Sequence, residues 1–137
     1  MKELMKSNIY DVDETIIVVG SCLKNMQPKG YEELQKISNN IYELCLEETH
    51  INMATTKLLG MIRAKNISKI IFASVDKSPH CIQLHYLQDE ISKLGFKIDF
   101  TNYVCVDNSL IEISKDTISL SKNLFKLNEF QKNIKNN

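Results

Sequence analysis

The sequence predicts a single α/β domain with three layers, in which a mainly parallel sheet lies between helices. Runs rich in β-branched residues at 16–19 and 70–75 are typical of strands that are covered on both faces. Between them, apolar residues recur at spacings of three and four, which is the period of amphipathic helices. With 137 residues, 43% of them hydrophobic, the chain has the size and the apolar content of one domain over 1–137.

The first half is expected to contain one strand and two helices. Residues 1–8 show no sustained period and are expected to be a frayed end. The strand at 16–19 ends at Gly20-Ser21-Cys22. A helix after Pro28 is predicted by a stripe of apolar residues, namely Tyr31, Leu34, Ile37, Ile41, Leu44 and Cys45. A second helix is expected over 52–65, with Ala54, Leu58, Met61 and Ile62 facing the core.

The second half repeats the alternation of strand and helix. Its expected elements are a strand at 70–75, a helix at 79–94 followed by Gly95, a strand at 96–106, and a terminal helix at 124–134 before a frayed end at 135–137. Alternating apolar residues at 110–120 predict a C-terminal β-hairpin around Lys115-Asp116, although a helical interpretation of that stretch stays open.

Composition narrows the classes of partner. Lys and Arg together number 17, as do Asp and Glu, so the chain lacks the positive excess that nucleic acid or anionic lipid attracts. The N-terminal segment has no apolar signal region, and no apolar run is long enough to span a bilayer. We therefore expect a cytoplasmic protein with reduced cysteines. A small molecule or a protein is the expected partner, and a homo-oligomer stays open.

A candidate site lies where the first two strands end. In parallel sheets the loops after the carboxyl ends of the strands form the ligand crevice, and Cys22 and Cys81 each follow such an end. Ser78-Pro79 is typical of a helix start, which would place His80 and Cys81 in the first turn, where the helix dipole favours a thiolate. Cys81 and His80 are therefore the candidate catalytic residues of a binding or redox module.

Two kinds of ligand fit this site. Cys22, Cys81 and His85 form a mixed sulfur and imidazole set of the sort that zinc or an iron–sulfur cluster accepts. Alternatively, an anion such as phosphate would rest on the helix start, bound by Gly20, Ser21, Ser78 and His80. Without a ligand, Cys81 would be a small buried residue, and His85 would be either a histidine on the helix surface or a hydrogen-bonded core histidine.

The segment Asp11-Val12-Asp13-Glu14-Thr15 resembles the DxDxT nucleophile motif of the haloacid dehalogenase family. In that resemblance, Ser74 corresponds to the family's second motif and Asp107 to part of its acidic metal motif. It implies a magnesium-dependent phosphate-handling hydrolase that uses Asp11 and Asp13. The sequence departs from the family in that the apolar run follows the aspartates instead of preceding them, and no lysine motif accompanies them.

Residues 52–106 are also similar in element order to ribosomal L7Ae-type RNA-binding proteins. Those proteins bind RNA with a glycine-threonine-asparagine-glutamate segment, and Asn52-Met53-Ala54-Thr55 stands in its place here. This likeness therefore concerns architecture alone. A third class, a structural or interaction protein without catalysis, stays open beside the redox module and the hydrolase.

Overall fold

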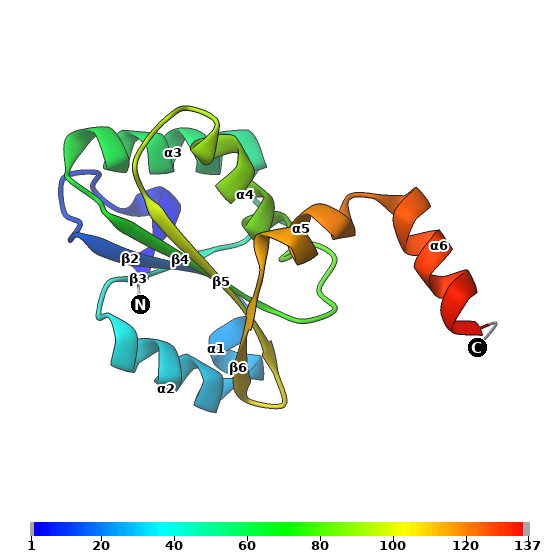
Figure 1. The fold of residues 1–137 in the computed structure, drawn as a ribbon. Coiled ribbons are helices and arrows are strands. Elements are labelled where there is room, and N and C mark those ends of the chain that lie inside the picture. The colour runs from blue at the N-terminus through cyan, green and yellow to red at the C-terminus, as the bar shows by residue number, and fades with distance from the viewer. Residues whose placement is uncertain (1, 136–137) are drawn as a thin grey trace.

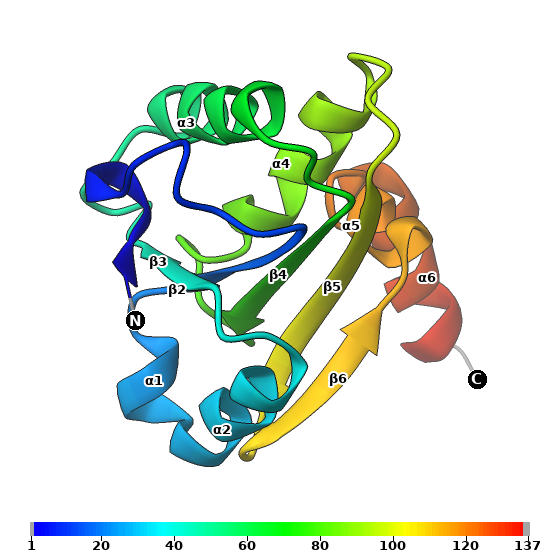
Figure 2. The same ribbon diagram turned by 90° about the vertical axis from the view of Figure 1, so that its left-hand side faces the viewer.

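The computed structural model describes residues 2–135, which form one sheet between two layers of helices (Figures 1 and 2). Its strands are β1 (Lys2–Glu3), β2 (Thr15–Gly20), β3 (Ile41–Leu44), β4 (Lys69–Val75), β5 (Asp99–Val106) and β6 (Ser109–Ile113). They lie in the order β1-β3-β2-β4-β5-β6, and all pairs are parallel except β5 with β6. The predicted three-layer α/β fold with a mainly parallel sheet is confirmed.

Helices lie on both faces of this sheet, and the last of them projects away from it. They are α1 (Leu23–Met26), α2 (Pro28–Ile37), α3 (Ile51–Ala64), α4 (Gln83–Ser92), α5 (Lys115–Ser121) and α6 (Leu124–Lys135). One core cluster joins α3 and α4 to Ile16, Val18 and Phe72, and the other joins α1 and α2 to Ile17 and Val19 (Figure 2). Alternate residues of β2 thus enter opposite cores, which explains why its sequence is apolar throughout.

The order of the strands creates a switch point between β2 and β4. From β2 the chain moves to β3 on one side, and then returns through α3 to β4 on the other side. Val19 pairs with Ala73 near the carboxyl ends of the two strands. The loops that leave these strands therefore diverge at the place where open α/β sheets bind ligands.

The predicted helix after Pro28 is wrong beyond Ile37. Ser38 takes an extended conformation, and Ile41–Leu44 forms β3 beside β2. Tyr42 is fully buried there, and its hydroxyl donates to the carbonyl of Asp11 at 2.9 Å. Short apolar runs fit both the helix and the strand period. Here the strand forms because it pairs with the backbone N–H and C=O groups along the edge of β2.

The β-hairpin lies earlier than predicted. Its turn is Asp107-Asn108, with φ angles of 48° and 65°, a two-residue turn whose twist suits antiparallel strands. Lys115-Asp116 instead begins α5, where the Ser114 hydroxyl accepts from the Thr117 N–H at 3.1 Å. The helical interpretation thus holds for the second part of 110–120.

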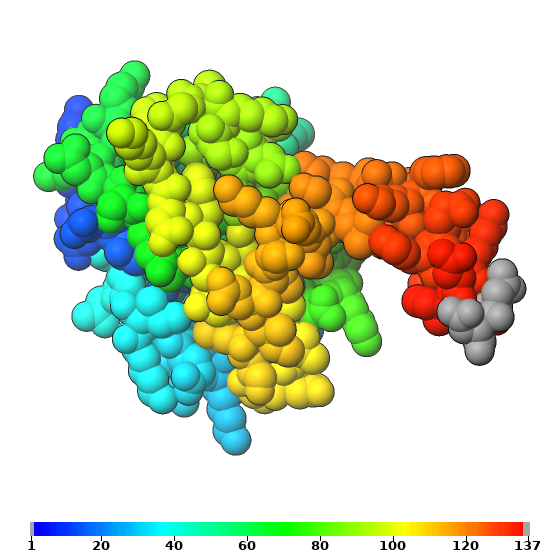
Figure 3. Space-filling view, viewed as in Figure 1, coloured from blue at the N-terminus to red at the C-terminus, as the bar shows by residue number. Residues whose placement is uncertain are grey.

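The two ends differ from each other. Residues 2–8, which were expected to fray, contain β1 and a fully buried Leu4, whereas Met1 lies outside the described residues. Helix α6 projects from the body and buries none of its side chains (Figures 1 and 3). Its last residue is Lys135, and the rest of the expected frayed end, 136–137, also lies outside the description. Within residues 2–135, no helix is long and apolar enough to cross a membrane.

Candidate functional site

The structure brings Cys22 and Cys81 together at the switch point. Cys22 follows β2, and Cys81 lies in the turns between β4 and α4, so 59 positions separate them in the sequence. Their Sγ atoms are 3.7 Å apart. Cys22 is partly exposed, whereas only 8% of Cys81 is exposed. The pair is thus reachable from solvent on the Cys22 side.

Gly20 makes this approach of the two thiols feasible. A Cβ atom at Gly20 would lie 2.6 Å from Cys81 Sγ, a distance that real Cβ contacts do not show. Gly20 is also held in the sheet by its pairing with Leu44 of β3. The missing side chain therefore provides the space that the Cys81 sulfur occupies.

Burial and the neighbouring thiols disfavour the thiolate of Cys22. Burial raises the pKa of Cys22 most, the charge of Cys81 and its hydrogen bond raise it further, and the result is a pKa of about 11. The charge of Cys45 makes the smallest contribution to this rise. Cys45 follows β3 and is half-buried, so its predicted place inside a helix core is wrong and it lies at the same sheet edge.

Helix α4 begins at Gln83 and not at Pro79. Residues 79–82 form tight turns, and the Ser78 hydroxyl accepts from the Cys81 N–H at 3.3 Å. The N–H groups from Ile82 to His85 are already bonded to carbonyls three or four residues earlier. The helix start therefore offers an anion fewer free donors than the sequence predicts.

The remaining residues of the predicted anion site are partly engaged as well. The Ser21 N–H donates to the Leu44 carbonyl at 3.2 Å, and Gly20 belongs to the sheet. His80 is exposed in the turn beside Cys81. An anion site that combines these residues stays a prediction, with His80 and the Ser78 hydroxyl as its accessible groups.

His85 does not join the two cysteines. It is 2% exposed, with Nε2 2.7 Å from Ser74 Oγ and Nδ1 2.9 Å from Asn102 Oδ1. Both ring nitrogens are therefore occupied. Among residues 2–135, no group of three or more His, Cys, Asp or Glu side chains is arranged to hold a metal ion.

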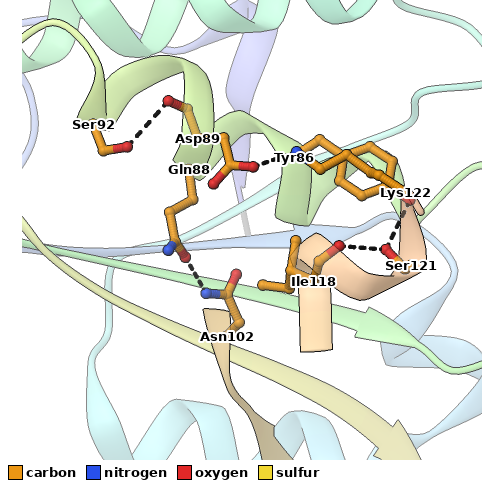
Figure 4. A network of polar contacts seen from close by, with 8 residues as sticks. All are labelled: Tyr86, Gln88, Asp89, Ser92, Asn102, Ile118, Ser121 and Lys122. Carbon is orange, nitrogen blue, oxygen red and sulfur yellow. Dashed lines mark hydrogen bonds and ion pairs between the residues drawn. The ribbon is translucent and has the colours of Figure 1, made fainter. Parts of the chain in front are cut away.

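The histidine instead belongs to a buried chain of polar groups. The Asn102 Nδ2 donates to Gln88 Oε1, as Figure 4 shows, and the Asn102 Oδ1 faces the imidazole. This arrangement assigns the proton to His85 Nδ1 and makes Nε2 the acceptor of the Ser74 hydroxyl. Burial lowers the pKa of His85, against a smaller opposite effect of Asn102, so the ring is neutral at pH 7.

A cavity of about 350 Å³ adjoins Ser74 and His85. It lies between the ends of β4 and β5, helix α4 and helix α5, and neither Cys22 nor Cys81 lines it. Sequence reasoning missed this cavity and the polar chain beside it. The available signal was Ser74 and Asn102, two polar residues inside otherwise apolar strand patterns.

The residues of the haloacid dehalogenase resemblance are not brought together. Asp11 and Asp13 are exposed before β2, at the amino ends of the strands, and Asp13 accepts from the Asn40 side chain at 2.5 Å. Ser74 lies near the carboxyl end of β4. Since Thr15 pairs with Lys69, five residues of strand, about 16 Å, separate that level from Ser74.

Comparison with known proteins identifies the family. The family model described as "Rossmann-like domain" matches residues 12–137, which include all strands from β2 to β6. Neither the curated proteins nor the solved structures contain a match. The sheet order and the family match agree, and the chain belongs to the Rossmann-like domain family.

Proposed function

We propose that this protein is a small cytoplasmic dithiol redox module whose active pair is Cys22 and Cys81. The observation that carries the proposal is the 3.7 Å separation of the two Sγ atoms. Two further features support it. The pair lies at the switch point of the sheet, and Gly20 leaves the space that Cys81 needs.

The loop after β2 argues for thiol chemistry rather than dinucleotide binding. A dinucleotide fingerprint places three glycines in this loop, and the sequence has only Gly20 in Gly20-Ser21-Cys22-Leu23-Lys24-Asn25. Helix α1, which follows, has four residues and offers little of the dipole that holds a pyrophosphate. Cys22 stands where the fingerprint requires a glycine for close approach of the backbone.

The proposed reaction is exchange with a small disulfide. The Cys22 thiolate attacks one sulfur of the external disulfide, and the other sulfur leaves as a thiolate that takes up a proton. The Cys81 thiolate then attacks Cys22 Sγ and releases the second external thiol. The protein loses two protons and two electrons to the external disulfide, which becomes two thiols.

The environment of the pair sets the expected rate. Cys22 is the more exposed thiol and meets the external disulfide first, but its pKa of about 11 keeps most of it protonated at pH 7. Exchange should therefore accelerate as the pH rises toward 11. His80, exposed beside Cys81, is the proposed proton acceptor for the second step.

Oxidation by glutathione disulfide tests the proposal. Reduced protein is placed in glutathione buffers at pH 7 and pH 9, trapped with an alkylating agent at successive times until equilibrium, and analysed by peptide mass spectrometry. We expect a Cys22–Cys81 crosslink that forms faster at pH 9 than at pH 7. Cys22→Ser and Cys81→Ser should abolish it, whereas the matched control Cys45→Ser should retain it. If both thiols are alkylated under every buffer while the fold stays intact, the pair has no redox function.

A metal function of the same residues would need more ligands. Zinc sites in proteins are usually four-coordinate, and the structure supplies Cys22 and Cys81 without His85. Elemental analysis of anaerobically purified protein distinguishes this alternative. Stoichiometric zinc or iron that is lost in Cys81→Ser would replace the redox proposal with a metal site.

Helix α6 supports a second function, the binding of a protein partner or of another copy of the chain. Its exposed apolar side chains are Leu124, Phe125, Phe130 and Ile134. A projecting helix with such residues is typical of an interaction surface. Sedimentation of the whole chain and of a chain that ends at 123 tests self-association. Equal monomer masses would exclude a homo-oligomer through α6.

A further inference from the structure

The cavity beside Ser74 has the dimensions of a small-molecule site. Its volume is about 350 Å³, and it opens to solvent on one side. Cavities that bind small ligands begin at about 300 Å³. Neither Cys22 nor Cys81 lines it, so the site is separate from the proposed redox pair.

Most of the wall is apolar. Its apolar surface comes from Val75, Ile82, Val104, Ile113, Ile118 and the ring of Tyr86. The two formal charges on the lining, Asp76 and Lys77, are exposed at the mouth and have opposite signs. His85 inside is neutral, so a buried ionic ligand would find no counter-charge and would pay the cost of desolvation.

Hydrogen bonding in the floor is directional. Asn102 Nδ2 donates to Gln88, so its Oδ1 accepts the proton of His85 Nδ1. Ser74 must then give its only proton to His85 Nε2, at 2.7 Å. The hydroxyl oxygen of Ser74 is left with acceptor capacity alone, and Ser74 is one of the residues that line the cavity.

Helix α5 contributes one wall of the cavity. Figure 4 shows its attachment to α4: Tyr86 Oη lies 3.1 Å from Ser121 Oγ, and Lys122 forms an ion pair with Asp89. Ile118 of α5 is 3% exposed and lines the cavity. Asp76, Lys77 and Pro79 line the cavity and are exposed, so its opening lies beside the loop after β4.

We infer that this cavity binds a small uncharged molecule with an apolar body and one hydroxyl or N–H group, which donates a hydrogen bond to Ser74 Oγ. A molecule of about a dozen non-hydrogen atoms fits the cavity, which opens to solvent on one side. The apolar wall and the neutral His85 select against charge. The orientation of the Asn102 amide makes Ser74 Oγ an acceptor, which a donor on the ligand satisfies.

A matched set of probes tests each part of this inference. The probes are p-cresol, p-xylene and 4-methylanisole, which share the apolar body, while only p-cresol has a donor. Binding to ¹⁵N-labelled whole chain is followed by NMR, together with the ¹⁵N shifts of the His85 ring. We expect p-cresol to bind about tenfold more tightly than either analogue, the ratio that one hydrogen bond of ~1.4 kcal/mol provides.

Cavity variants locate the binding. Ile118→Trp fills the cavity and should abolish binding of all three probes. If Ile118→Trp does not fold, Thr117→Phe serves as the cavity-filling variant. Ile111→Trp is the matched control, because Ile111 is 48% exposed and does not line the cavity. Cys22→Ser should bind p-cresol as the unmodified chain does, which separates this site from the redox proposal.

Any of three results with a bound probe would overturn the inference. They are equal affinities for p-cresol and 4-methylanisole, ring shifts that place the His85 proton on Nε2, and binding that survives the cavity-filling variant. An absence of chemical-shift changes at millimolar p-cresol would also overturn it.

Discussion

Replacing Gly20 by alanine tests whether the sheet edge is built around the Cys81 sulfur. The new Cβ would lie 2.6 Å from Cys81 Sγ, closer than van der Waals contact allows. Overpacking of this kind costs about 1–3 kcal/mol, and the lower chain entropy of alanine returns about 0.5–1 kcal/mol. We expect Gly20→Ala to lower the free energy of unfolding by about 1–2 kcal/mol, or roughly 4 °C in Tm per kcal/mol.

Cys81→Ala should reverse that loss. Without the sulfur, the nearest atom to the new Cβ is the Cβ of residue 81 at 3.6 Å, an ordinary contact. In the Cys81→Ala background, Gly20→Ala should therefore be neutral or slightly stabilising. The coupling free energy between Gly20→Ala and Cys81→Ala, measured in unfolding, is then about 1–3 kcal/mol.

Urea unfolding of the four chains under reducing conditions, at equal m-values, measures this coupling. A coupling below about 0.5 kcal/mol, the error of additivity, would refute the reasoning. It would mean that the sheet edge shifts freely, and that the 3.7 Å approach of the two thiols does not depend on Gly20.

Three further predictions concern the rest of the fold. Burial lowers the pKa of His85 below its ordinary 6.5, so the unfolded chain binds a proton at a higher pH than the folded chain does, and the free energy of unfolding should fall as the pH drops below about 6.5. Unfolding measured as a function of pH should show that His85→Gln loses this slope. The control His50→Gln should keep it, because His50 is exposed. Asp107 has a φ of 48°, so Asp107→Val should cost about 1–2 kcal/mol in urea unfolding and Asp107→Gly should not. Removal of residues 124–137 should change the free energy of unfolding by less than about 0.5 kcal/mol, because α6 buries no side chain; a larger loss would show that α6 packs on the body in solution.

Patterns of local period predicted the central part of the fold. The strand at 16–19 and the helix at 52–65 lie close to their observed bounds, and Gly95 has the positive φ of a residue just past a helix. The helix at 52–65 is long and periodic, and the run at 16–19 consists entirely of β-branched residues, so a local pattern favours the right element in each case. The prediction of a helix at 41–44 was wrong, because the strand there depends on pairing with β2, which lies outside a local window of the sequence.

The candidate site was predictable in its place but not in its composition. Strand ends at one sheet edge follow from parallel topology, so the meeting of Cys22 and Cys81 could be anticipated. His85 was grouped with them because four residues separate it from Cys81. The turns at 79–82 break the helical spacing on which that grouping depended, and His85 faces Ser74 and Asn102 instead.

The turns at 79–82 connect the two proposed sites. Cys81 faces Gly20 and Cys22 on one side, whereas Pro79 and Ile82 line the cavity on the other. A bond between the two sulfurs requires them to come closer than 3.7 Å, and the shift must come from these turns or from the loop that carries Cys22, because β2 and β4 are fixed by their pairing. If the turns at 79–82 move, oxidation of the cysteine pair also moves Pro79 and Ile82 in the cavity wall. A ligand in the cavity then opposes or assists the same movement of the turns. Linkage requires the two effects to be equal, so a change in ligand affinity on oxidation is matched by an equal factor in the redox equilibrium of the pair.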